Sequence, residues 1–279
     1  MDIIRTDSAR SEYYSFLRQN FPWPWGEYEK FVWKHLKDPF LGENDFYILE
    51  QNNNIQSMCV VRKYTFIYHK RAYNVLSMMD FVTASQARNT GKLSAVLQHI
   101  YKNIDFDYSI GFSSYQLRET VHRKTKCVQM YYTYLFPPSS SPLTSELCND
   151  EEAILALNSN ENAFQIPRTK KYINYIKNNP CYKKIIFLKY DSLVIGVAFE
   201  INKENSVRIV ELSNYSFEAC MIAYKMASIF RNPVKIDLPQ KLAKGNFIKD
   251  TCFAIFNPHS NYHTIHEGDL IWVPHSDRK

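Results

Sequence analysis

The sequence predicts a mixed α/β (α+β) protein of two tandem modules, each with a mixed central sheet flanked by helices. Strand-like and helix-like hydrophobic patterns alternate along the 279 residues, which is typical of a sheet covered by helices. The same order of patterns also occurs twice, on either side of segment 137–142 (PPSSSP). Because prolines and serines favour irregular backbone, we expect a first module over 1–136, a linker over 137–142 and a second module over 143–279.

The first module is expected to start with a helix and a hairpin. Residues 30–40 (KFVWKHLKDPF) have apolar side chains at helical spacing and end at a proline. Residues 46–62 (FYILEQNNNIQSMCVVR) are two apolar runs around a polar turn, which is typical of a β-hairpin. The rest follows as a strand at 73–82, a glycine-containing turn, a helix at 94–104, a strand at 106–112, a polar helix at 115–124 and a strand at 127–136.

The second module repeats this order. Residues 171–182 (KYINYIKNNPCY) correspond to the first helix, and 185–200 correspond to the hairpin. They are followed by a strand at 207–212, a helix at 217–230, a strand at 234–238, a helix-like segment ending near 249, and strands at 252–256 and 270–274. The strand-to-helix junction of this module (SNYSF, 213–217) has neither glycine nor arginine, so we expect a degenerate copy.

Composition narrows the classes of protein. Hydrophobic residues make up 45% and charged residues 22% of the chain, as in globular proteins. The net charge of +6 suits anionic small molecules such as coenzymes and nucleotides. No basic run or zinc-finger or RNA-binding signature argues for a nucleic-acid partner. No apolar run approaches the roughly 18 residues that cross a bilayer, and the N-terminus does not resemble a secretory signal, so we expect a cytoplasmic protein without a membrane partner.

Cysteines and histidines do not suggest a metal site. The six cysteines are widely spaced without any CxxC pair, which favours reduced, mostly buried thiols. Four of the eight histidines lie near the C-terminus at irregular spacing, which favours a polar loop over a zinc site. We therefore expect no metal. His263, within that loop, is a candidate for lining an acceptor-substrate site.

The turn between 83 and 97 (TASQARNTGKLSAVL) holds one of only 7 glycines in the chain. A strand that runs through a glycine turn into a helix exposes backbone N–H groups, which attract phosphate together with the helix dipole. Arg88 and Lys92 add positive charge beside Gly91. On these residues alone, a plain structural turn remains the alternative.

The order of elements around this turn resembles the GNAT superfamily of acyl-CoA-dependent N-acyltransferases. The family turn reads Q/R-x-x-G-x-G/A, and residues 88–93 (RNTGKL) are similar to it, with Leu93 in place of the last small residue. The resemblance covers about 27–136, with the second half as a degenerate copy, and implies mostly antiparallel sheets. The double arrangement is similar to sugar N-acyltransferases of bacterial polysaccharide (O-antigen) biosynthesis.

The resemblance implies acyl-CoA as the co-substrate. The edge of the strand before the turn would pair with the pantetheine amides, and a backbone N–H near Val82 would polarise the thioester carbonyl. Backbone N–H groups of the turn would hold the pyrophosphate. The residues implied in cofactor binding are Phe81, Val82, Thr83, Gln86, Arg88, Asn89, Thr90, Gly91, Lys92, Leu93 and Ser94.

Proton transfer has three candidates. Asp80 precedes the turn and is a candidate general base, with a role in orienting the loop as the alternative. His122 falls near the position of the family's general acid and has a suitable ordinary pKa, but an exposed histidine is the alternative. Tyr115 is the third candidate. Trp23 and Trp25 could stack on a nucleotide base or sugar, or pack the N-terminal segment onto the core.

The resemblance implies direct transfer of an acetyl or short hydroxyacyl group, such as 3-hydroxybutanoyl, from coenzyme A. The acceptor would be the amino group of a nucleotide-linked amino deoxy sugar, attacking within a ternary complex. The alternatives are an acyltransferase for another amine (aminoglycoside, peptide or protein lysine), a non-catalytic acyl-CoA-binding protein and a purely structural double sheet. An oligomer is compatible with each.

Overall fold

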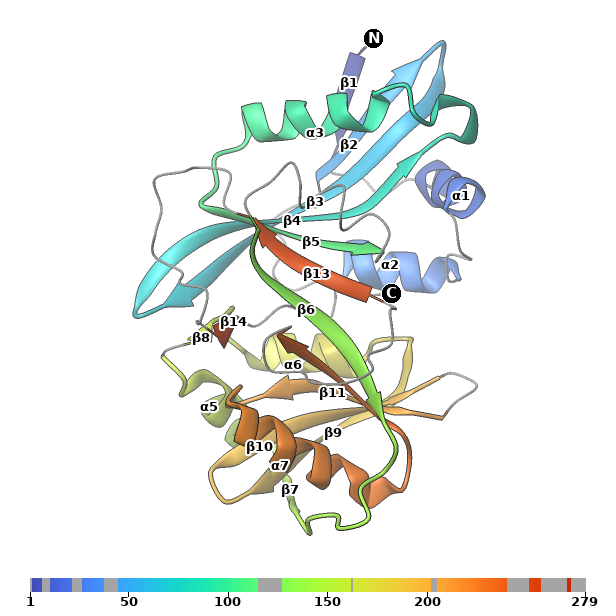
Figure 1. The fold of residues 1–279 in the computed structure, drawn as a ribbon. Coiled ribbons are helices and arrows are strands. Elements are labelled where there is room, and N and C mark those ends of the chain that lie inside the picture. The colour runs from blue at the N-terminus through green and yellow to red at the C-terminus, as the bar shows by residue number, and fades with distance from the viewer. Residues whose placement is uncertain are drawn as a thin grey trace.

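The structure is a computed structural model in which two sheet-and-helix modules lie one above the other (Figure 1). It describes residues 2–6, 11–21, 27–37, 45–114, 127–161, 163–201, 205–239, 251–256 and 270–271. The helices are α1 (Ser11–Asn20), α2 (Tyr28–Leu36), α3 (Lys92–Asn103), α5 (Asp150–Asn158), α6 (Lys170–Lys177) and α7 (Phe217–Ala227), with short 3-10 helices η1 (Ser85–Ala87) and η2 (Ser228–Phe230).

The strands form one large sheet and a small one. In chain order they are β1 (Asp2–Thr6), β2 (Asp45–Gln51), β3 (Asn54–Tyr68), β4 (Arg71–Thr83), β5 (Tyr108–Ser114), β6 (Cys127–Phe136), β7 (Glu146–Cys148), β8 (Ala163–Phe164), β9 (Tyr182–Tyr190), β10 (Leu193–Glu200), β11 (Val207–Leu212), β12 (Val234–Pro239), β13 (Thr251–Phe256) and β14 (Leu270–Ile271). The large sheet has the order β1-β2-β3-β4-β5-β13-β6-β12-β11-β10-β9-β7, and β14 pairs with β8.

The two modules share one plan. In each, two hairpin strands and a third strand are antiparallel neighbours, and a helix then connects the third strand to a parallel fourth strand. In the first module β4 pairs in parallel with β5 after α3, and in the second β11 pairs in parallel with β12 after α7. The other described pairs of the large sheet are antiparallel. The predicted α/β class with repeated, mostly antiparallel modules is therefore confirmed.

The modules exchange strands where they meet. Strand β13 follows the second module in sequence, yet it pairs with β5 of the first module on one side and with β6 on the other. Strand β6 in turn pairs with β12 of the second module. Figure 1 shows β6 running as a long diagonal between the modules. The first module's sheet is thus completed by a segment that lies more than a hundred residues later in the chain.

Each sheet face has its own core. Helices α1 and α2 cover one face of the first module, and their core includes Phe31, Phe46 and Val82. Helix α3 covers the opposite face through Val96 and Ile100. Helix α7 packs on the second module, and its core includes Ala223 and Met226. These helices are amphipathic, and burying their apolar sides stabilises the sheet between them.

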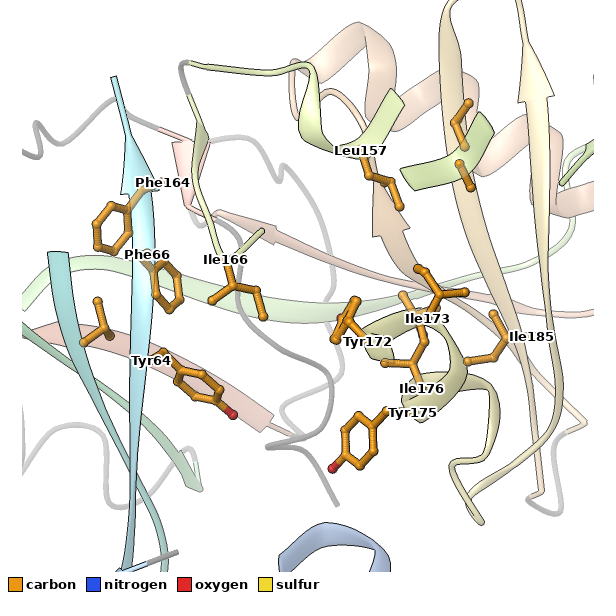
Figure 2. Packing of buried hydrophobic residues seen from close by; sticks show 14 of the residues in the cluster. Tyr64, Phe66, Leu157, Phe164, Ile166, Tyr172, Ile173, Tyr175, Ile176 and Ile185 are labelled. Carbon is orange, nitrogen blue, oxygen red and sulfur yellow. The ribbon is translucent and has the colours of Figure 1, made fainter. Parts of the chain in front are cut away.

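Another core joins the modules. Figure 2 shows Tyr64 and Phe66 of β3 facing Tyr172, Ile173 and Ile176 of α6, with Ile166 between them and Phe164 beside Phe66. Close by, the Trp33 ring of α2 stacks on Tyr175, with 4.5 Å between ring centroids and 5° between planes. The Trp33 Nε1–H also donates to the Tyr175 carbonyl at 3.2 Å. The inter-module contact is therefore apolar and specific in geometry.

The sequence predicts most of these elements closely. The first hairpin differs, because β3 continues beyond Arg62 to Tyr68 and turns back at His69 and Lys70, which have positive φ values of 46° and 63°. The helix expected over 171–182 ends at Lys177. Elements that the patterns did not indicate are β1, α1, β7, α5 and β8. The predicted segments 115–124 and 240–249 lie outside the described residues, and no described helix is long and apolar enough to span a bilayer.

Candidate active site

Strands β4 and β5 separate part-way along their length. Their parallel register extends from Val75 paired with Tyr108 to Met78 paired with Gly111. Beyond that point β4 continues to Thr83, while β5 continues as a partner of β13. Among the described strands, the edge of β4 over 79–83 therefore has a partner only in β3. An edge of this kind can pair with an extended ligand through backbone hydrogen bonds.

A β-bulge at Asp80 lies at this separation. Val60 pairs with Met79 and Met58 pairs with Val82, so Asp80 and Phe81 together oppose the single residue between Met58 and Val60. Asp80 has a positive φ of 52°, which is uncommon for a residue with a side chain. A bulge bends its strand and changes the direction of side chains, and here it turns Asp80 toward α2.

Asp80 is held by two side chains of α2. Its Oδ1 accepts from Lys34 Nζ at 3.0 Å, and its Oδ2 lies 2.8 Å from His35 Nε2. The three side chains are at most 1% exposed. Burial lowers the pKa of His35 to about 4, with Lys34 and Arg62 acting in the same direction and Asp80 opposing them. His35 is therefore neutral near pH 7, and Lys34 supplies the positive charge beside the carboxylate.

The backbone after β4 forms the expected turn. Gly91 precedes α3 with a φ of 78°, in the left-handed region, and Asn89 also has a positive φ of 62°. No atom lies within 4 Å of the position that a Gly91 Cβ would occupy. The Gly91 carbonyl accepts from Ala95 N at 3.0 Å, which starts the helix. Since the first N–H groups of a helix have no intrahelical acceptor, this end favours an anion.

The side chains of the turn contact neighbouring elements. Arg88 Nη2 donates to the Asn20 carbonyl at the end of α1 at 2.8 Å, and Asn20 Oδ1 accepts from Ser85 N at 3.2 Å. Lys92 Nζ donates to Gln51 Oε1 at 3.1 Å. Asn20 and Gln51 were not among the sequence candidates, because nothing in their local patterns indicates contact with a turn that follows about forty to seventy residues later in the chain.

The open edge of β4 presents the backbone of Thr83. Ala84 N donates to Gln56 O at 2.9 Å, and hydrogen-bonded pairs alternate with non-hydrogen-bonded pairs along an antiparallel ladder. Val82, paired with Met58, therefore directs its backbone groups toward β3, and Thr83 directs its N–H away from β3. The resemblance implied a backbone donor near Val82, and the N–H on the open side of the edge is that of its neighbour Thr83.

The second module starts its corresponding helix differently. Ser216 caps α7, and its Oγ accepts from Ala219 N at 3.1 Å. Ser216 has an ordinary negative φ of −63°. A side-chain cap satisfies a helix N–H that α3 leaves available, because Gly91 has no side chain. The second module thus has the strand and helix of the first but a different helix start, in line with the expected degeneracy.

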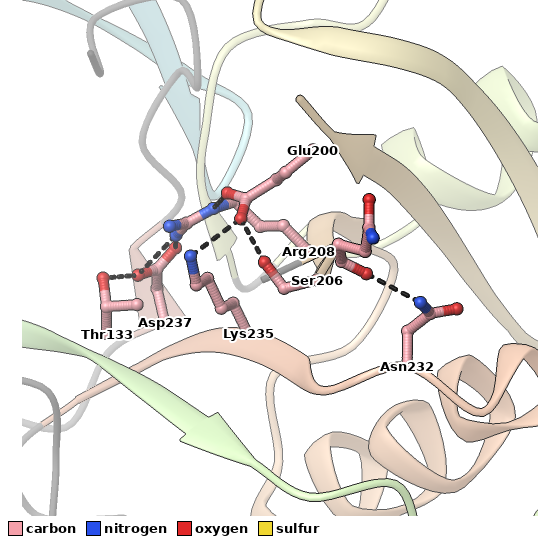
Figure 3. Close-up of polar contacts among 8 residues, drawn as sticks. Thr133, Glu200, Ser206, Arg208, Asn232, Lys235 and Asp237 are labelled. Carbon is pink, nitrogen blue, oxygen red and sulfur yellow. Dashed lines mark hydrogen bonds and ion pairs between the residues drawn. The ribbon is translucent and has the colours of Figure 1, made fainter. Parts of the chain in front are cut away.

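A polar cluster lies at the other end of the second module's strands (Figure 3). Glu200 accepts from Arg208 Nε at 2.7 Å and from Lys235 Nζ at 2.8 Å. Asp237 forms an ion pair with Arg208 Nη1 at 3.3 Å and accepts a hydrogen bond from Thr133 Oγ1 of β6 at 2.6 Å. Burial raises the pKa of Glu200, but Arg208, Lys235 and Ser206 together outweigh it and lower the value to about 2. Through the bond between Thr133 and Asp237, the cluster connects the crossing strand β6 to the second module.

The remaining candidates divide into two groups. The implied cofactor residues from Phe81 to Ser94 form one continuous strand end, turn and helix start. Five candidates lie outside the described residues: Tyr115, His122, Trp23, Trp25 and His263. Within the described ranges, no three metal-binding side chains gather, and Cys59, Cys148, Cys181 and Cys220 are free thiols.

The fold has solved counterparts. It is similar to a GCN5-related N-acetyltransferase from Anabaena variabilis ATCC 29413 (TM-score 0.62, 13% identity, covering 92% of this chain and 73% of that one). It is also similar to a GCN5-related N-acetyltransferase from Kribbella flavida (TM-score 0.61, 11% identity, 91% and 71% covered). A third counterpart is a conserved protein of unknown function from Enterococcus faecalis V583 (TM-score 0.59, 13% identity, 92% and 73% covered).

No protein-family model matches the sequence, and no curated protein is similar to it by sequence. At 10–13% identity the structural likeness defines the fold. The class is therefore that of the GNAT fold, built from two modules with the candidate site in the first.

Proposed function

We propose that this protein is an acyl-CoA-dependent N-acyltransferase whose first module binds the coenzyme. The observation that carries the proposal is the separation of β4 from β5 beyond Met78, with the open strand end leading into a left-handed turn at Gly91 that starts α3. These two features together suit a coenzyme with an extended amide arm and a diphosphate. The GNAT fold of the structural counterparts supports the same class of reaction.

The coenzyme would extend from the turn at 88–94 to the open strand edge at 81–83. Its diphosphate would accept from the backbone N–H groups of 88–94, and its pantetheine amides would pair with the edge over 81–83. The Thr83 N–H would donate to the thioester oxygen and stabilise the negative charge that develops there. Arg88 has five donors, so it can keep its bond to Asn20 and still donate to a phosphate oxygen.

The chemistry would be direct transfer within a ternary complex. The amine nitrogen attacks the thioester carbon and gives up a proton to a base, the C–N bond forms, the C–S bond breaks, and the leaving thiolate takes a proton from an acid. Asp80, His122 and Tyr115 remain the candidates for moving these protons. The contacts of Asp80 with Lys34 and His35 favour the orienting role for Asp80, which leaves His122 and Tyr115 as the stronger candidates. No metal takes part in this scheme.

The proposed acceptor is the amino group of a nucleotide-linked amino deoxy sugar, and the acyl group is acetyl or a short hydroxyacyl such as 3-hydroxybutanoyl. This finer assignment rests on the resemblance of the two-module arrangement to sugar N-acyltransferases. Trp23, Trp25 and His263 are the proposed acceptor contacts, and the proposed compartment is the cytoplasm. A second candidate function, a non-catalytic acyl-CoA-binding protein, is favoured by the engagement of both Asp80 oxygens.

Calorimetry and a thiol-release assay test the proposal. We expect the full chain to bind acetyl-CoA, and to release thiol from acetyl-CoA or 3-hydroxybutanoyl-CoA with at least one member of a panel of amino-sugar nucleotides. If only an aminoglycoside or a peptide amine is acylated, that amine replaces the amino sugar as the acceptor in the proposal. Binding without turnover on any amine would favour the non-catalytic candidate, and absence of binding would reject the proposal.

A further inference from the structure

The bulge in β4 has a dedicated support on α2. A non-glycine residue at positive φ is strained, and it persists where the surrounding contacts hold it. Asp80 is such a residue, and its carboxylate is fixed at 3.0 Å by Lys34 and at 2.8 Å by His35. Lys34 and His35 are consecutive residues in the last turn of α2, so one rigid helix holds both carboxylate oxygens.

The bulge determines where the strand edge points. The bulge begins two residues after Met78, the last β4 residue that pairs with β5. Without the extra residue, every side chain from Asp80 onward would exchange faces, and the backbone groups of 81–83 would change direction with them. The contacts of Asp80 are therefore made at the residue on which the geometry of the open edge depends.

We propose that Lys34 and His35 are positioning residues for acyl-CoA: by binding Asp80 they fix the bulge that directs the β4 edge toward the pantetheine arm. This inference rests on the proposed function. It assigns Asp80 to the same positioning unit. Lys34 and His35 touch no reacting atom in this scheme, and their effect reaches the coenzyme through the backbone of 81–83.

The second module contains a matched control. There, Glu211 of β11 is a buried carboxylate held by Tyr172 of α6 and by Arg168, with 3.2 Å between Arg168 Nε and Glu211 Oε2. The arrangement is the same in kind, a strand carboxylate bound from the helix that precedes the hairpin. Glu211 also adjoins a bulge, because Gly196 pairs with Glu211 while Val197 pairs with Ile209, which leaves Val210 as the extra residue. Tyr172→Phe therefore removes a comparable buried hydrogen bond without touching the β4 edge.

Two probes separate positioning from general destabilisation. Acetyl-CoA carries the pantetheine arm, whereas 3′-phosphoadenosine 5′-diphosphate carries only the nucleotide and diphosphate. We expect Lys34→Met to lower the affinity for acetyl-CoA by about tenfold at alkaline pH and to leave the affinity for the nucleotide unchanged. Tyr172→Phe should change neither. Equal losses for both probes, or an equal effect of Tyr172→Phe, would overturn the proposal.

The pH dependence gives a further readout. The charged groups that face His35 in the described structure are Asp80 of β4, Lys34 of α2 and Arg62 of β3. Removing Lys34 removes a group that lowers the pKa of His35, so in Lys34→Met this pKa should rise, and a protonated His35 can then balance the charge of Asp80. The acetyl-CoA affinity of this variant should therefore fall as pH rises through the raised pKa of His35. The wild type and the double variant K34M/D80N should lack this dependence, and a pH-independent Lys34→Met would contradict the proposal.

Amide hydrogen exchange distinguishes failure of this inference from failure of the proposed function. If the wild type binds no acetyl-CoA, the proposed function fails, and the positioning role is judged on the free protein. Faster exchange over 79–83 in Lys34→Met than in Tyr172→Phe would support it. Equal exchange in the two variants would overturn it.

Discussion

Gly91 combines two properties that a substitution can separate. Its φ of 78° disfavours any residue with a side chain, and the space beside its Cα is open. Valine at this φ costs about 1–2 kcal/mol because its branched Cβ clashes with the backbone, whereas asparagine adopts this region more readily.

We therefore expect Gly91→Val to lose acetyl-CoA binding through distortion of the turn. Gly91→Asn should keep the turn and the stability of the protein, and any loss of binding would then come from the side chain covering the phosphate position. Calorimetry with acetyl-CoA, together with urea unfolding of each variant, gives both quantities. Unchanged binding in both variants would show that the coenzyme does not approach Gly91.

Glu200 should make the stability of the folded protein depend on pH. Its pKa is lowered from 4.5 to about 2, so the folded state binds the proton more weakly than the unfolded state. The stabilisation is present above pH 4.5 and is lost as pH falls toward about 2. Glu200→Gln should reduce stability at neutral pH, and the difference from wild type should shrink on acidification.

Urea unfolding of Glu200→Gln at several pH values measures this difference. Glu146→Gln, at an exposed glutamate of β7, is the control and should show no such trend. A Glu200→Gln difference that stays constant with pH would mean that its contacts with Arg208 and Lys235 do not stabilise the fold.

At the scale of elements, the packing of α2 on α6 joins the two modules through Trp33 and Tyr175. Stacked aromatic pairs contribute about 0.5–1.5 kcal/mol beyond their buried area. A double-mutant cycle with Trp33→Leu and Tyr175→Leu should give a coupling free energy in this range by urea unfolding. Coupling near zero would show that the rings stabilise the protein independently of each other.

Elements were predictable from sequence where their patterns are local. Strand β6 and strand β11 have the predicted bounds, because continuous apolar runs between turn residues are unambiguous. Helix α1 was missed because it lies outside the repeated order of patterns, although its buried Tyr13, Phe16 and Leu17 have helical spacing. Gly91 was identified because glycine is rare in this chain. The contacts of Asp80 with Lys34 and His35 were not, because residues 45 positions apart carry no sequence pattern that joins them.

At the scale of the whole molecule, the strand exchange makes the first module dependent on the second. Residues 1–136 alone lack β13, so β5 would have no partner beyond Gly111 and β6 would have neither β13 nor β12. We expect this fragment to show no cooperative urea unfolding, and co-expression with 137–279 to restore it. A cooperative transition for 1–136 alone would show that the first module folds independently.

The position of β13 also orders events during synthesis. Ribosomes add about 5–20 residues per second, so several seconds pass between release of β5 and release of residues 251–256. Throughout that interval the nascent sheet has two unfilled edges next to the candidate coenzyme site. Residues 251–256 must therefore leave the ribosome before the sheet beside the proposed ligand site is complete.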